Sequence, residues 1–136
     1  MSLVKMAFML ALAMVAGQVQ PPKNDPNGIW ESETGTRFEM RLSGDDLRIQ
    51  LVEGSNPAFL KYDVNLKNTG EKNTYAGAGS FVAKMKTGKE CTFATRWQLI
   101  VVQAEMIVGS TTSVIPNPET CEVTESGESM IILKKK

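Results

Sequence analysis

The side chains that most often carry chemistry are scarce in this sequence. It contains two cysteines, Cys91 and Cys121, and no histidine. Without histidine there is no Ser-His or Cys-His nucleophile and no imidazole base. Carboxylates such as Glu39 and Asp63 fall on the solvent-facing positions of alternating segments, so no pair of them is placed for acid–base catalysis. The sequence therefore predicts no catalytic residues and no cofactor, and we expect a binding protein rather than an enzyme.

Neither a metal centre nor a phosphate-binding loop is expected. The acidic stretches GDD at 44–46 and ESGES at 125–129 offer only oxygen ligands, which would hold calcium weakly, and we interpret both as hairpin turns. The stretch GAGS at 77–80 lacks the lysine and the strand-to-helix setting of a phosphate loop.

The N-terminus has the pattern of an export signal. Lys5 precedes an uninterrupted apolar run from Met6 to Ala16, which is long enough for a signal and too short to span a bilayer. We therefore expect residues 1–17 to be a cleaved signal peptide and residues 18–27 to be a flexible arm of a secreted or periplasmic protein. No second such run follows, so no membrane span is expected after cleavage.

Export also determines how the cysteines and the charge are interpreted. In an oxidising compartment an even number of cysteines indicates a disulfide, so we expect Cys91 to be bonded to Cys121. The full chain has 15 basic and 15 acidic side chains. Cleavage of the signal would remove Lys5 and leave a net charge of −1. Nucleic acid is not an expected partner, because binding to it needs a basic face.

From Gly28 onward apolar and polar residues alternate, as in strands buried on one face. Phe38, Met40 and Leu42 share one face of their segment, and the alternation also places Leu60 and Tyr62 inside. Short stretches rich in glycine, asparagine, aspartate and proline separate the segments. The expected strands are about 28–32, 36–42, 46–52, 58–67, 74–86, 90–101, 105–114, 121–125 and 128–134.

Regular short strands joined by short turns predict an all-β, antiparallel up-and-down barrel of eight or nine strands, with a β-sandwich as the alternative. We expect one such domain over residues 28–136. Alternating strand directions place the loops 32–36, 53–57, 86–90 and 115–120 at one rim. The N-terminal arm then lies at the other. One cysteine of the bridge must lean inward or sit in a connector, because next-nearest strands are too far apart for a disulfide.

Several inward positions are candidates for a ligand site. Two inward glycines, Gly77 and Gly79, remove side chains from the core, which leaves space for a ligand or permits a bend in the strand. Trp97 is inward near the middle of its strand and needs a partner for its indole N–H, such as Tyr62, Tyr75 or Thr95. The full candidate ligand set is Tyr62, Tyr75, Gly77, Gly79, Phe81, Phe93 and Trp97.

Gly28-Ile29-Trp30 at the head of the first expected strand resembles the start of lipocalin-like and avidin-like secreted barrels of the calycin type. The resemblance covers these three residues and the overall strand rhythm. It implies that Trp30 is structural and plugs the barrel near its closed end. The inward parity of Trp30, opposite to Ile29 and Glu31, agrees with that role.

Two functions remain open from the sequence. The first is binding of a small apolar molecule inside the barrel. The second is a filled-core barrel whose loops bind or inhibit an exported protein. An open interior would favour the first and a packed interior the second. If the closed end is the one plugged by Trp30, the entrance lies at the opposite rim, where two of the four loops contain Asn-Pro.

Overall fold

The structure is a computed structural model that describes residues 24–136, and the predicted signal peptide lies outside the described residues. Every regular element in residues 24–136 is a strand. The eight strands are β2 (Gly28–Ser32), β3 (Arg37–Ser43), β4 (Asp46–Leu51), β5 (Phe59–Asn68), β6 (Thr74–Lys84), β7 (Glu90–Gln103), β8 (Met106–Pro116) and β9 (Val123–Lys135). Residues 24–136 contain no helix that is long and apolar enough to cross a membrane.

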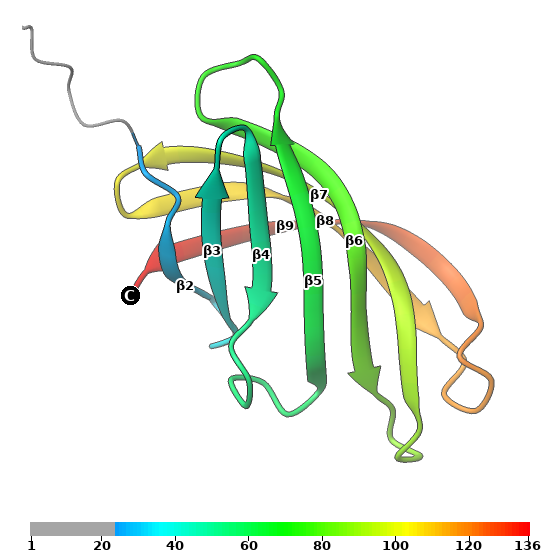
Figure 1. The fold of residues 1–136 in the computed structure, drawn as a ribbon. Helices are drawn as coiled ribbons and strands as arrows, with labels where there is room; N and C mark the ends of the chain where they lie inside the picture. Colours follow the sequence, from blue (N-terminus) through cyan, green and yellow to red (C-terminus); the bar gives the residue numbers. More distant parts are fainter. Residues whose placement is uncertain (1–23) are drawn as a thin grey trace, which may run out of the picture.

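The strands form a closed barrel in sequence order, and each neighbouring pair is antiparallel (Figure 1). The closing pair, β2 with β9, is short, since it covers only Trp30–Ser32 against Leu133–Lys135. The all-β fold and the up-and-down barrel predicted from the alternation are confirmed. The closed barrel is also compatible with the calycin-type resemblance carried by Gly28-Ile29-Trp30.

One predicted turn is wrong. The segments 121–125 and 128–134 are not two strands, because β9 runs through ESGES without a turn and pairs continuously with β8. Gly127 lies opposite Ser113 within this ladder. The composition of ESGES is typical of a turn, but the long facing strand β8 keeps the backbone extended.

The start of β5 also departs from simple alternation. A register shift lies between Phe59 and Lys61 in the pairing with β6. Such a bulge turns the residues before it to the other face. Phe59 therefore faces inward and packs against Tyr62, whereas Leu60, which was predicted to be inside, is 42% exposed.

The larger part of the core fills the end of the barrel that holds the N-terminal residues. Trp30 is fully buried there, and its indole N–H donates a hydrogen bond of 2.8 Å to the carbonyl oxygen of Pro26. The ammonium of Lys135 lies 5.3 Å from the centre of its ring. The side-chain amide of Asn24 donates to the Val101 carbonyl at the same end. Trp30 is thus a buried core residue at this end of the barrel, as its parity predicted.

The inward glycines of β6 leave no open space. A Cβ on Gly79 would overlap the carbonyl oxygen of Asp63 and lie 2.6 Å from the Cα of Val64. A Cβ on Gly77 would overlap the carbonyl oxygen of Asn65 in the same way. The backbone of β5 occupies the space, so the glycines allow a close approach of two strands, and of the two alternatives the structural role is the one observed.

Candidate functional site

An open cavity lies at the rim opposite Trp30. Its volume is about 560 Å³, within the range typical of small-molecule sites. A smaller hollow of about 180 Å³ adjoins it and shares Phe59, Tyr62, Thr34 and Thr111 with it. The rim is the one at which the loops after β2, β4, β6 and β8 meet (Figure 1), as the alternating strand directions predicted.

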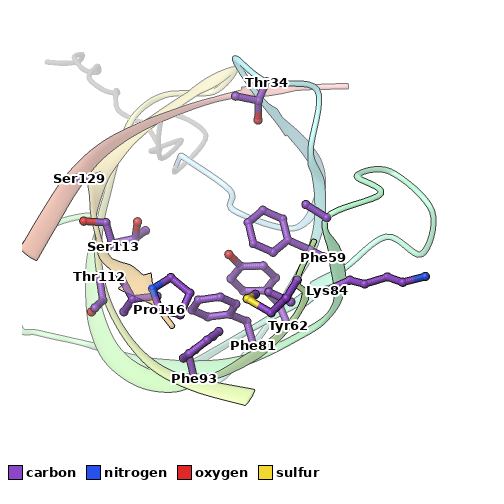
Figure 2. A pocket seen from close by; sticks show the side chains of 15 residues that line it. Thr34, Phe59, Tyr62, Phe81, Lys84, Phe93, Thr112, Ser113, Pro116 and Ser129 are labelled. Atoms are coloured by element: carbon purple, nitrogen blue, oxygen red, sulfur yellow. The ribbon is translucent and has the colours of Figure 1, made fainter. Parts of the chain in front are cut away.

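Aromatic rings form one side of the cavity. The rings of Tyr62 and Phe81 are stacked, with centroids 4.9 Å apart and an interplanar angle of 12°. Phe59 meets both of them edge-on, and Phe93 lies 5.4 Å from Phe81. Figure 2 shows these four rings gathered on the same side of the barrel, and we call them the aromatic wall.

Tyr62 is the polar group of the aromatic wall. Burial raises its pKa to about 12, so its hydroxyl is protonated at neutral pH and available to donate a hydrogen bond. Figure 2 shows the hydroxyl directed into the cavity. A ligand with an acceptor oxygen or nitrogen would satisfy this group.

Hydroxyl groups form the opposite side, which β8 and β9 supply. This hydroxyl wall consists of Thr111, Thr112, Ser113 and Ser129. The Thr112 hydroxyl is already engaged, because its Oγ1 accepts a 2.8 Å hydrogen bond from the backbone N–H of Arg96 and donates to the Arg96 carbonyl at 3.4 Å. Lys84 is the charged residue among the lining residues, but Figure 2 shows its side chain extending away from the cavity. The site therefore has one apolar face and one face rich in neutral hydrogen-bonding groups.

The floor separates the cavity from the packed core. Phe38 contacts Tyr62 and Trp97 edge-on, at centroid distances of 5.2 and 5.3 Å. Trp97 is buried below this contact, and its indole N–H donates to Thr95 Oγ1 at 3.1 Å. Thr95 was one of the three partners considered for this group. The aromatic wall is continuous with the core, so its rings are held by packing before any ligand arrives.

Hydrogen bonds between loops fix the entrance. On one side the side-chain amide of Asn56 donates to Thr36 Oγ1 at 2.7 Å, joining the loops after β4 and β2. On the other side Thr87 Oγ1 donates to the Pro118 carbonyl and Lys89 Nζ donates to the Glu119 carbonyl. The two Asn-Pro loops are therefore parts of a braced rim.

The predicted disulfide is confirmed and braces the second side further. Cys91 and Cys121 are bonded, with their Cα atoms 5.5 Å apart. Cys91 lies near the start of β7, and Cys121 lies in the connector between β8 and β9. This is one of the two placements that the strand spacing allowed. Near the bridge β7 and β8 are not paired with each other. Their strand pairing runs only from Trp97 and Thr111 toward the β7–β8 turn.

Three of the predicted ligand residues come together at the cavity, namely Tyr62, Phe81 and Phe93. Tyr75 and Trp97 are instead buried in the larger core cluster. Gly77 and Gly79 do not line the cavity, because β5 packs against them. The sequence interpretation missed Phe59 and the hydroxyl wall. The run STTS at 110–113 in an otherwise apolar strand is the signal from which the hydroxyl wall was predictable.

The arrangement can hold a small molecule through apolar contacts on one side and hydrogen bonds on the other. Its lining combines aromatic rings, small apolar side chains, neutral hydroxyls and one lysine. Within residues 24–136 no group of three or more metal-ligating side chains gathers at one place. The sequence matches no protein-family model, and searches of curated proteins and of solved structures gave no relative.

Proposed function

We propose that this protein is a lipocalin-like, non-enzymatic carrier of a small apolar molecule, exported by its N-terminal segment to the periplasm or cell exterior. The observation that carries the proposal is the open cavity of about 560 Å³ with the stacked rings of Tyr62 and Phe81 on its wall. An accessible cavity favours this function over a filled-core barrel that acts only through its loops.

The two walls define the chemistry of the ligand. A flat apolar ring system or a short acyl chain would lie against Phe59, Phe81 and Phe93, where it replaces water on apolar surface. Polar atoms on its other edge would face Ser113 and Ser129 and accept a hydrogen bond from Tyr62. The ligand is therefore mainly apolar, with one polar edge.

The disulfide supports the proposed compartment. Such bonds persist in secreted and periplasmic proteins and are rare in the cytosol. Here the bond joins β7 to the connector that frames the entrance, so the oxidised form is the one with a braced rim.

Uptake of a naphthalene-sulfonate dye, whose fluorescence rises in apolar surroundings, tests the proposal. Ser113→Trp places a large ring at an exposed lining position and should abolish the fluorescence rise, while the far-ultraviolet circular dichroism stays unchanged. Ser43→Trp, at an exposed position at the end of β3 on the opposite rim, is the matched control and should bind as wild type does. Equal dye binding by both variants, or none by wild type, would contradict the proposal.

A further inference from the structure

A second feature is the free edge of β9, which adjoins the cavity at Ser129 of the hydroxyl wall. Along its whole length β9 pairs with β8, but on its other side it pairs with β2 only from Leu133 to Lys135. Among the described residues no strand lies beside the segment 124–130 on that side. The barrel is closed at one end and has an unpaired strand edge at the other.

The backbone of this segment presents its hydrogen-bonding groups to the open side. The N–H of Lys135 donates to Glu105 in the β7–β8 turn, whereas the N–H of Lys136 donates to Ile29 of β2. Because these directions alternate along a strand, the even-numbered residues of β9 face the β2 side. The amides of Ser126, Glu128 and Met130 therefore point toward the free edge, whereas Thr124 lies at the register shift opposite Ile115 and Pro116, where the alternation is interrupted.

The edge has only some of the usual protections of an edge strand, namely the charges of Glu125 and Glu128 and the register shift opposite Ile115 and Pro116. Proline, lysine and a covering loop normally prevent pairing with other chains. The segment 123–130 contains neither proline nor lysine, and all its residues are exposed. Met130 is 81% exposed, and Val123 and Ile115 on the same hairpin are also exposed. Exposed apolar side chains beside an unpaired edge are typical of a surface that accepts an added strand.

The charge of the β8–β9 hairpin indicates which kind of strand its free edge would bind. From Trp97 to Leu133 the sequence contains no lysine or arginine, and the hairpin carries Glu119, Glu122, Glu125 and Glu128. A second copy paired through the same edge would bring two acidic hairpins together, which repels. A basic segment would instead place opposite charges across the strands, which stabilises the pairing.

We propose that the edge of β9 over residues 125–130 binds an extended basic segment of another exported protein as an added antiparallel strand. The direction follows β2, which is antiparallel to β9 at the closed end. Basic side chains of the partner lie opposite Glu125 and Glu128, and an apolar side chain lies opposite Met130. The added strand continues the line of β2 beyond the β2–β3 turn.

The test uses the full mature chain and the labelled peptide Val-Thr-Lys-Thr-Val-Lys-Thr, whose lysines face Glu128 and Glu125 in the antiparallel register. Fluorescence anisotropy measures affinity, and amide hydrogen exchange measures protection. Binding should slow exchange at Ser126 and Glu128. The same peptide with glutamate in place of both lysines, or with N-methyl groups on its pairing amides, should bind at least about tenfold more weakly.

Two protein variants separate the edge from general charge. Glu128→Lys should weaken binding about tenfold, whereas Glu105→Lys, an equal charge change on an exposed turn at the other rim, should not. Ser126→Pro removes one edge N–H and should abolish protection.

Binding of the N-methylated peptide as tight as that of the parent peptide would overturn the proposal. So would equal effects of the two charge reversals, or an absence of protection at millimolar peptide. Protection of Ser126 without peptide would also overturn it. The mass in solution would then identify the occupant as a second copy, if dimeric, or as the N-terminal segment of the same chain, if monomeric.

Discussion

Removal of the Cys91–Cys121 bridge should lower the free energy of unfolding of the barrel. It should also open the hairpin of β8 and β9 beside the cavity. The bridge closes a loop with a sequence separation of 30 residues. In the chain-entropy model, closing a loop of this size stabilises the folded state by about 3.5 kcal/mol. The figure is an upper bound if the hairpin of β8 and β9 can separate locally while the barrel stays folded.

The structure favours local separation of the β8–β9 hairpin from the barrel in addition to the loss of global stability. Beyond Trp97 and Thr111 the hairpin makes no strand pairing with β7. It is then held by the disulfide, by the contacts of Thr87 and Lys89 with the connector, and by the bond from Arg96 to Thr112. The end of the hairpin should therefore open first when the bond is lost, and the hydroxyl wall would move away from the aromatic wall.

Urea unfolding of the oxidised protein, the reduced protein and the double variant Cys91→Ala/Cys121→Ala measures the global part. We expect the free energy of unfolding to fall by about 2–3.5 kcal/mol in both altered forms. Amide hydrogen exchange should become faster over residues 112–130 and stay unchanged in β3 and β4. A loss below about 1 kcal/mol, or uniform acceleration across the barrel, would refute the reasoning.

Three further perturbations have defined outcomes. Trp30→Ala should lower the free energy of unfolding by about 4 kcal/mol, because a fully buried indole and its hydrogen bond are lost, and an unchanged urea midpoint would contradict this. The pKa of Tyr62 is raised to about 12, so its stabilising contribution is complete below its unfolded value near 10 and is lost as pH rises through 12. In Tyr62→Phe the urea midpoint should fall less than in wild type as the pH rises over that alkaline range. An equal fall of the midpoint in both proteins would count against burial of the hydroxyl. Gly79→Ala should destabilise by more than about 2 kcal/mol through overlap with Asp63, whereas Gly127→Ala, with its nearest contact at 3.9 Å, should be nearly neutral, and equal effects would refute the close approach of β5.

The alternation of side chains was sufficient to predict most of the fold. Phe38 and Met40 face the core as their spacing requires, and the rim that carries the entrance followed from alternating strand directions. These features are local or repeat along the chain. The continuity of β9 through Gly127 was not predictable in this way, because a facing strand outweighs the turn preference of glycine and serine.

The candidate site was predictable only in part, because curvature and bulges decide which inward residues face open space. Gly79 points inward, but the bend of the sheet brings the backbone of β5 against it. Phe59 reaches the cavity through a register shift that no local pattern reveals. Tyr62, Phe81 and Phe93 were identified because they are large aromatic residues at inward positions in the parts of their strands nearest the open rim, where the cavity lies.

The central claim is that the cavity between the aromatic and hydroxyl walls holds a small, mainly apolar molecule. Nuclear magnetic resonance of the protein with the bound naphthalene-sulfonate dye tests it most directly, because proton contacts locate the dye. We predict contacts from the dye to the rings of Phe59, Tyr62 and Phe81 and none to Trp30, with 1:1 saturation. Contacts only to exterior residues such as Val102, or a spectrum unchanged at saturating dye, would contradict the claim.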